Sequence, residues 1–432
     1  MTGDRREGLA ARWERSADHR QWTYHLRTGV RWHDGRPVTM DDVEFTLKLH
    51  SRPDSPYWGP RFIQTLTVHD GSSFTVRGSE WSDSAVSILP KHLLKDLDYQ
   101  KFYDWDFWER PVGNGPYRYS RHLPHTMVEL EANADYFKGE PRIPRVVLRF
   151  AGQSGVTELR SGNVDAIQLD PAHVRGIASD PRFRTYWEPN PGRSWALVWQ
   201  NQHPFFRDRQ TRHALSLAIN RRELLQVLGL PAQLSLVDGV ESIRQFRRGQ
   251  LAEPRYDVAE AMRLLDEAGW RQSRGGMRER DGHGFHFTAL TLAESPGDQA
   301  ALYVQDQLRR LGVRMELQRL ERHALLDRLH AGKFEAIVTF LLMRPSYAEK
   351  WTAGAGYRNS QLARLFKVAA TAADPEVEDG AYREISGLVR ADRPVAFLFR
   401  AAGAHVAHRR VRGLVDSRQA NPLLFADELW LE

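Results

Sequence analysis

A histidine followed by an aspartate, His33-Asp34, is the first place where the residue types match catalytic chemistry. An imidazole beside a carboxylate is half of the dyad that activates a nucleophile. Gly35 follows at once, and Asp-Gly is a common turn dipeptide, so we interpret the motif as a turn. The sequence has no GxSxG, HExxH or Walker motif, no GxGxxG between a strand and a helix, and no cysteine. We therefore predict no catalytic residues and no enzyme activity.

Four histidines near the start of the chain offer nitrogen ligands for a metal: His19, His25, His33 and His50. His19 and His25 are six residues apart across a predicted strand, and no carboxylate stands in ligand register with them. We interpret these histidines as surface or packing residues. The sequence predicts neither a metal site nor any other cofactor.

Length and charge exclude several other classes of protein. At roughly 100–200 residues per domain, 432 residues predict two or three domains. The composition, 41% hydrophobic and 27% charged, is typical of folded proteins. The net charge of +6 comes from 53 Arg and 8 Lys scattered among 55 acids, without the clusters typical of nucleic-acid binding. The longest candidate for a membrane span, the mostly apolar stretch 334–343, has only the length of a strand.

The first half of the chain predicts short strands and turns with one well-marked helix. Residues 22–26 alternate between apolar and polar, as in a half-buried strand. A helix begins after Thr39, with Asp42 placed to complete a capping box. Residues 146–150 and 164–169 predict further strands.

The stretch from 204 to 340 predicts alternating helices and strands. Asp208 marks the start of one helix that runs to Gly229, and Asp257 marks another that ends at Gly269. Later strands and helices alternate up to a strand at 334–340, which favours a largely parallel sheet. Residues 393–399 predict one more buried strand.

Aromatic residues gather where two of these strands begin or end. Trp195 and Trp199 lie near a predicted chain crossing, and Tyr347 and Trp351 follow the strand that ends near Phe340. Ligands of open α/β sheets bind beyond the carboxyl ends of strands, so the second group is placed to line a cleft. The alternative is that these rings fill hydrophobic cores, where aromatic residues are common.

A series of short motifs along the chain resembles the family 5 extracellular solute-binding proteins, the peptide, dipeptide and nickel binders of ABC importers. The first is the segment from Leu9 to Val43, which contains Trp13 and the His33-Asp34-Gly35 turn. Further matches follow in family order: Leu89-Pro90-Lys91-His92, Val112-Gly113-Asn114-Gly115-Pro116-Tyr117, Asp135-Tyr136-Phe137-Lys138-Gly139, Gly162-Asn163-Val164-Asp165, Pro204-Phe205-Phe206-Arg207-Asp208 with Ala218-Ile219-Asn220-Arg221, and Tyr256-Asp257 with Ala268-Gly269-Trp270.

The resemblance implies an α/β protein with a type-II periplasmic-binding-protein fold, in which two lobes joined by a hinge close over a ligand. An extra subdomain sits on the first lobe of this fold. By resemblance, residues 1–110 form the extra subdomain of lobe I, residues 111–199 and 400–432 form the lobe I core, and residues 200–399 form lobe II.

The chain departs from the family pattern in two places. Family members carry a further segment before the one that contains Trp13, including a first strand of lobe I, and we expect this chain to lack it. Peptide binders of the family often have an aspartate after the strand that ends near Phe340, where this chain has Arg344. An arginine pairs well with a carboxylate or phosphate, so we expect an anionic or differently oriented ligand.

The function implied by the resemblance is capture of a peptide or similar small polar solute and its delivery to an ABC permease by a monomer, with no nucleic acid involved. This predicts a periplasmic or extracytoplasmic protein, although residues 1–8 show no leader. The alternative is the solute-sensing domain of a cytoplasmic transcriptional regulator whose DNA-binding domain is absent from this chain. The predicted ligand contacts are Trp195, Trp199, Asn201, Arg344, Tyr347 and Trp351.

Overall fold

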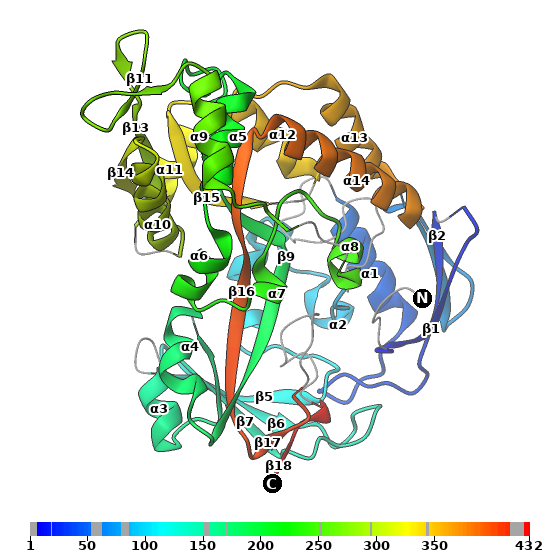
Figure 1. Ribbon diagram of the computed structural model, residues 1–432. Coiled ribbons are helices and arrows are strands. Elements are labelled where there is room, and N and C mark those ends of the chain that lie inside the picture. Colours follow the sequence, from blue (N-terminus) through cyan, green and yellow to red (C-terminus); the bar gives the residue numbers. More distant parts are fainter. Residues whose placement is uncertain are drawn as a thin grey trace.

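Two long strands, β9 (Phe183–Trp199) and β16 (Val395–His408), run side by side through most of the length of the molecule (Figure 1). Elements far apart in the sequence gather around their two ends. The computed structural model describes residues 7–18, 20–52, 63–78, 86–150, 155–169, 171–249, 253–293, 296–342, 345–372, 374–414 and 427–432.

The two strands belong to a six-stranded sheet with the order β14-β13-β15-β9-β16-β8. The pairs β13–β14 and β13–β15 are parallel, whereas β9 is antiparallel to both β15 and β16, and β8 is antiparallel to β16. The parallel pairing predicted for the strands up to 334–340 is confirmed for β13, β14 and β15, but the sheet as a whole is mixed, because β9, β16 and β8 join it antiparallel. The other strands are β8 (Ala166–Leu169), β13 (His286–Leu292), β14 (Arg314–Leu320) and β15 (Ala336–Leu342).

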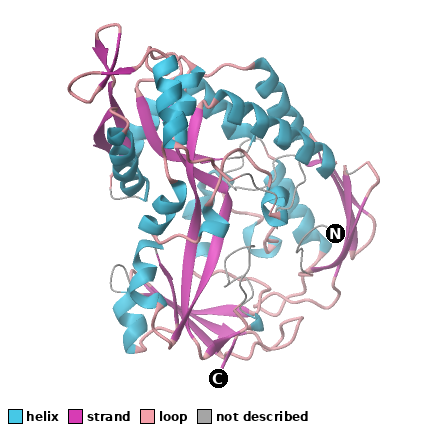
Figure 2. Cartoon of the chain, viewed as in Figure 1, coloured by secondary structure: helices cyan, strands magenta, loops and turns pink. Residues whose placement is uncertain are grey.

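Helices cover both faces of the upper half of this sheet, which we call lobe II (Figure 2). Side chains alternate along β9, so that Leu197 and Trp199 enter one core while Ala196 and Val198 enter the other. The first core is completed by α5 (Arg209–Leu217), α6 (Arg221–Leu228), α9 (Val258–Glu267) and α10 (Pro296–Arg310). The second is completed by α11 (Arg322–His330), α12 (Pro345–Gly354), α13 (Ser360–Thr371) and α14 (Pro375–Asp392).

The helix predicted from Asp208 to Gly229 is in fact two helices, α5 and α6. Asp208 caps α5 as expected, accepting hydrogen bonds from the amides of Gln210 and Thr211. Asn220 then begins α6 by accepting a bond from the Glu223 amide, a second cap that the apolar periodicity concealed. Gly229 ends α6 with a left-handed backbone, as predicted.

Two short helices, α7 (Ala232–Ser235) and α8 (Ile243–Arg248), follow α6 and lie against the crossing strands. A small three-stranded sheet projects from the top of lobe II (Figure 1). Its strands are β10 (Arg271–Gln272), β11 (Arg278–Arg280) and β12 (His283–Gly284).

The lower ends of the crossing strands, together with β8, form what we call lobe I. Helix α3 (Gly155–Ser161) packs on one side with α4 (Pro171–Ala178), where Leu159, Ile177 and Phe183 share a core. A separate antiparallel sheet lies below, made of β5 (Tyr117–Leu123), β6 (Met127–Ala132) and β7 (Arg145–Arg149). Strands β17 (Val411–Arg412) and β18 (Trp430–Leu431) pair beside it.

The first strands and helices of the chain pack around two small cores of their own and form what we call the N-terminal subdomain, whose sheet lies on the right of Figure 1. Its sheet has the order β1-β2-β4-β3, formed by β1 (Ala10–Arg15), β2 (Gln21–Leu26), β4 (Ser73–Gly78) and β3 (Ile63–Val68). Four helical segments accompany it: α1 (Met40–Ser51), α2 (Lys91–Leu94), η1 (Tyr99–Asp104) and η2 (Asp106–Trp108). The exact domain boundaries predicted from the sequence stay predictions.

The predicted helix start at Thr39 is confirmed, and Asp42 contributes more than a cap. Its buried carboxylate accepts bonds from the Thr39 amide at 2.8 Å, from the Lys91 amide at 2.9 Å and from the Trp32 indole N–H at 3.3 Å. One side chain thereby joins the start of α1 to the start of α2. Within the described residues, no helix has both the length and the apolar character needed to span a membrane.

A close contact beneath the first core of lobe II gives a test of the fold. A side chain at Gly297, in the first turn of α10, would overlap the indole ring of Trp195. We expect Gly297→Ala to lower the free energy of unfolding by about 1–3 kcal/mol, measured by urea denaturation. Gly387→Ala, in the exposed interior of α14 where a methyl group meets open space, is the control and should stabilise the protein by about 0.4–1 kcal/mol. Equal effects at the two sites would contradict the packing of α10 on β9.

Candidate functional site

The junction between the lobes lies where the pairing of the two crossing strands is interrupted. Ala402 pairs with Pro189 and Arg400 pairs with Ser194. Between these two pairs β9 advances by five residues, whereas β16 advances by two. The extra stretch, Asn190–Arg193, therefore leaves the β16 ladder at mid-length. At its end Arg193 pairs with Leu342, the last residue of β15. The interruption thus meets the carboxyl end of a strand, where ligands of α/β sheets bind.

One face of this junction is aromatic. The Trp195 ring is stacked on Phe399 at 5.9 Å and meets Phe340 edge-on at 5.7 Å. Trp187 packs against the same cluster from the lobe I side. These four rings come from β9, β15 and β16, and Trp195 is 6% exposed. The cluster fixes the relative positions of the three strands at the point where the lobes meet.

Arg193 lies on this aromatic face and is exposed. Its guanidinium lies 4.7 Å from the centroid of the Phe340 ring, a cation–π distance. Among the described residues this guanidinium has no carboxylate partner. The ring therefore orients a positive charge whose hydrogen-bond donors stay available to an anion.

The opposite face of the junction holds a buried ion pair. Arg400, 1% exposed, contacts the Glu241 carboxylate and lies 4.5 Å from the centroid of Phe246. Burial raises the pKa of Glu241, and the guanidinium of Arg400 opposes this rise. Arginine keeps its proton even when it is buried, so we interpret the pair as ionised. It ties β16 to the segment that carries α7 and α8.

The structure places three of the sequence-predicted contact residues inside cores or chain crossings. Trp199 has no exposed surface and packs on Phe206, and Trp351 is 4% exposed in the second core of lobe II. The Asn201 amide donates to the carbonyls of three residues: Trp199, Ala355 and Pro394. In this conformation all three residues support the lobe, and their predicted role as ligand contacts stays a prediction.

The other three predicted contacts stay predictions. Trp195 lies at the junction, as its place near the chain crossing suggested. Tyr347 belongs to α12, but its side chain, like the whole of Arg344, lies outside the described residues. Sequence reasoning missed Arg193. The signal that precedes it is Pro191-Gly192, a turn dipeptide within a strand pattern, which marks an interruption but not its chemistry.

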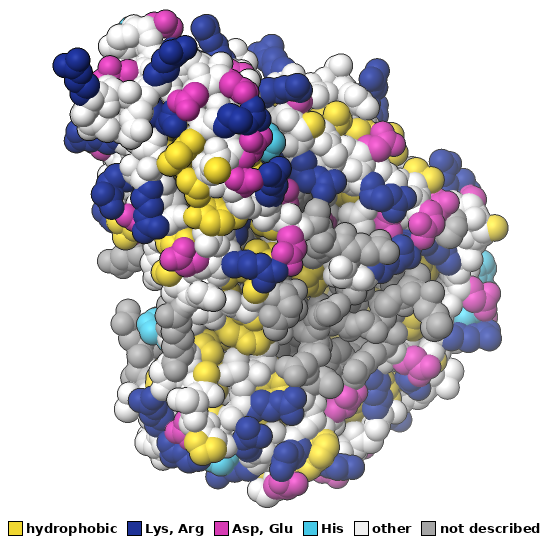
Figure 3. Space-filling model, viewed as in Figure 1, with side chains coloured by type: hydrophobic (Ala, Val, Ile, Leu, Met, Phe, Trp, Pro, Cys, Tyr) yellow, Lys and Arg dark blue, Asp and Glu magenta, His cyan; other side chains and the backbone are white. Residues whose placement is uncertain are grey.

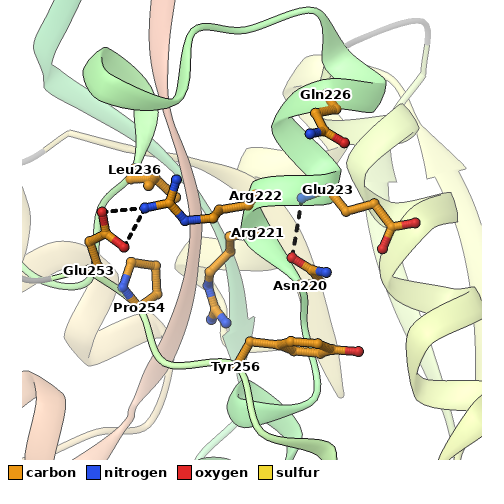
Figure 4. A pocket seen from close by; sticks show the side chains of 9 residues that line it. All are labelled: Asn220, Arg221, Arg222, Glu223, Gln226, Leu236, Glu253, Pro254 and Tyr256. Atoms are coloured by element: carbon orange, nitrogen blue, oxygen red, sulfur yellow. Dashed lines mark hydrogen bonds and ion pairs between the residues drawn. The ribbon is translucent and has the colours of Figure 1, made fainter.

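A second candidate is a polar pocket of about 590 Å³ beside α6 (Figure 4). Arg222 and Glu253 form an exposed ion pair across it, and Tyr256 lies along its lower edge. The Arg221 guanidinium below is already bonded to the carbonyls of Phe397, Ser216 and Ile219. The charged groups of this pocket are thus satisfied by the protein itself. Its remaining lining residues are Asn220, Glu223, Gln226, Leu236 and Pro254.

Neither place offers the ligands of a metal centre. Within the part of the chain that the structure describes, no three His, Asp or Glu side chains come together in a way that would hold a metal ion. Basic and acidic side chains are interspersed over the face seen in Figure 3. The arrangement at the junction suits non-covalent binding, with aromatic surface and one oriented cation.

Comparison with known proteins agrees with this fold. The model of the bacterial extracellular solute-binding proteins, family 5 (middle), matches residues 5–353, most of the chain. The protein belongs to that family. Its two lobes, hinge strands and additional subdomain are the type-II periplasmic-binding-protein fold.

Relatives within the family have diverged widely. The oligopeptide-binding protein AppA of Bacillus subtilis is 24% identical over 406 residues, which span 87% of this chain and 74% of AppA. A putative ABC transporter peptide-binding protein of Brucella ovis is 29% identical over 305 residues, 67% of this chain but only 55% of the relative, little more than half its length.

Solved structures show the same fold at lower identity. The structure of AppA from Bacillus subtilis in complex with a nonapeptide has a TM-score of 0.71 and 22% identity, covering 98% of this chain and 90% of AppA. NikA from Brucella suis in complex with Fe(III)-EDTA has a TM-score of 0.81 and 17% identity, covering 98% of this chain and 91% of NikA.

The supporting role of Asn201 leads to a prediction. Asn201→Ala removes the donor for three buried carbonyls and should cost about 1–3 kcal/mol of unfolding free energy. Asn190→Ala, at an exposed position on β9, is the control and should change the free energy of unfolding by less than about 0.5 kcal/mol. Thermal and urea denaturation measure both. A fully stable Asn201→Ala protein with impaired solute binding would restore Asn201 to the binding surface.

Proposed function

We propose that this protein is the substrate-binding component of an ABC importer. It works outside the cytoplasmic membrane, where it captures a peptide and delivers it to the permease. Support comes from membership of a solute-binding family and from relatives named as peptide-binding proteins. The single structural observation that carries the proposal is the junction, where two hinge strands meet an aromatic surface and an oriented guanidinium.

The mechanism follows from the connection between the lobes. Ligand contacts made by both lobes stabilise a closed state relative to an open one, and the permease distinguishes the two states. Among the described strands, β9 and β16 alone run from lobe I into the upper half of the sheet, and their pairing is interrupted at Asn190–Arg193. Bending at this interruption leaves the ladders on either side intact. The protein supplies binding and conformational change, and no covalent step is required.

The ligand contacts that we propose lie at the carboxyl end of β15. Arg193 is held over Phe340, where it can pair with a carboxylate of the solute through two parallel hydrogen bonds. Trp195 and Tyr347 are proposed as apolar neighbours, and Arg344 as a second cation. A short peptide with a free carboxyl terminus fits this chemistry, since its extended body needs apolar surface and its terminus needs a cation.

Arg193→Ala tests the carboxylate contact. Native mass spectrometry of the purified protein with a pool of short peptides identifies a binder, which is then synthesised with a free and an amidated carboxyl terminus. We expect Arg193→Ala to weaken binding of the free form about tenfold, or about 1.4 kcal/mol, by isothermal titration calorimetry. The amidated form should lose little.

Arg184→Ala is the matched control, because Arg184 is exposed on the same strand and is stacked at 5.0 Å on Tyr186 in the lobe I half. It should leave both affinities unchanged. If no peptide binds the wild-type protein, the proposed function fails. If peptides bind but the free and amidated forms respond equally to Arg193→Ala, only the carboxylate contact fails.

A further inference from the structure

Two sequence motifs that the binding function does not use meet in the structure. The turn at His33-Asp34-Gly35 belongs to the N-terminal subdomain, and the turn at 112–116 leads into the β5–β6–β7 sheet of lobe I. The His33 amide donates to the Gly113 carbonyl at 2.8 Å. The half-buried His33 side chain is directed at the same turn, so close that a side chain at Gly113 would lie 3.3 Å from the imidazole. His33 thus contributes both its backbone and its side chain to the join between the two units, where Arg27 also lies over the Phe137 ring at 5.5 Å.

Both nitrogens of the His33 ring are bonded to this turn. The Gly113 amide donates to Nδ1 at 3.2 Å, and Nε2 lies 3.1 Å from the Gly115 carbonyl. An amide N–H only donates and a carbonyl only accepts, so Nδ1 is unprotonated and Nε2 carries the proton. Only the neutral Nε2–H tautomer satisfies both contacts. A second proton on Nδ1 would face the N–H of Gly113 and break that bond.

The groups around the ring also favour its neutral form. Burial lowers the pKa of His33, and the charge of Arg118 on β5 lowers it further. The hydrogen bond to Gly115 and the charge of Asp34 raise this pKa, but the net shift is downward. Asp34 itself is held by His92 of α2 at 2.7 Å. The Gly115 carbonyl accepts a second bond from Asn133, at 3.1 Å, which fixes the acceptor for Nε2.

We propose that His33 is a proton-sensitive latch, which joins the N-terminal subdomain to lobe I when neutral and releases the 112–116 turn when protonated. The sign follows from linkage. The released histidine, with an ordinary pKa near 6.5, binds protons more readily than the latched one, so the contact is at full strength above that pH. The contact weakens as the pH falls below about 6.5. At pH 5.5 it is weaker by up to about tenfold, and below the lowered pKa of the latched form it weakens no further.

Amide hydrogen exchange of the 112–116 segment measures the latch directly in the full chain. After correction for intrinsic exchange, protection of the Gly113 amide in the wild-type protein should fall severalfold, up to about tenfold, between pH 7.5 and pH 5.5. His33→Asn keeps an acceptor near the Nδ1 position but does not titrate, so its protection should not change with pH. His122→Asn, at an exposed position on β5, is the control and should retain the wild-type fall.

His92→Gln separates the neighbouring contact, because it removes the partner of Asp34 but leaves His33 in place. The wild-type fall at Gly113 should persist in this variant, and its loss would assign the effect to His92. A wild-type protein without the fall, or His33→Asn with it, overturns the proposal. If His33→Asn does not fold, nitrogen NMR of labelled histidine in the wild-type protein decides. An Nε2–H tautomer that persists below pH 6.5 supports the latch, and an unshifted titration refutes it.

Discussion

The pairing of β9 with β16 is the interaction on which the rest of the structure depends. These two strands supply the middle of the sheet in lobe II and part of the sheet in lobe I, so each lobe needs both of them to close its core. Buried arginines secure the pairing where it is irregular. Arg221 donates to the carbonyl of Phe397, at a bulge in β16, and Arg212 donates to the carbonyls of Asp392 and Arg393, just before that strand.

Arginine suits these positions because it remains protonated without a carboxylate beside it. Burial lowers the pKa of Arg221 to about 10, still well above the physiological range. Carbonyl oxygens at several angles are then satisfied by one planar group with five N–H donors. The cost of burying the charge is offset by backbone acceptors that would otherwise have no partner.

Local sequence signals predicted much of the fold, and long-range pairing accounts for what they missed. The caps at Thr39, Asp208 and Asp257 located helix starts correctly, because capping depends on neighbouring residues. The antiparallel partners of β9 lie about 140 and 200 residues further along the chain, and apolar alternation carries no information about direction. Asn220 was hidden for a related reason, since the apolar spacing continues across the break between α5 and α6.

The candidate site was harder to predict than the fold. A tryptophan in a core and a tryptophan in a binding surface have the same sequence pattern, so only their positions in the fold distinguish Trp199 and Trp351 from Trp195, which lies at the junction. Arg193 gained its significance from a ring more than a hundred residues away, Phe340. His33 was correctly interpreted as part of a turn, but the groups that select its tautomer belong to a distant second turn.

The antiparallel register of the two crossing strands also limits the degrees of freedom between the halves of the molecule. Sliding of β9 against β16 would require every pair in their ladder to change partners. A slip of one residue would turn every side chain to the opposite face, and a slip of two would displace the chain by about 7 Å. Each of these changes would empty the cores that Leu197, Val198 and Phe397 now fill. Bending at Asn190–Arg193 and twist about the strand pair are the motions that remain.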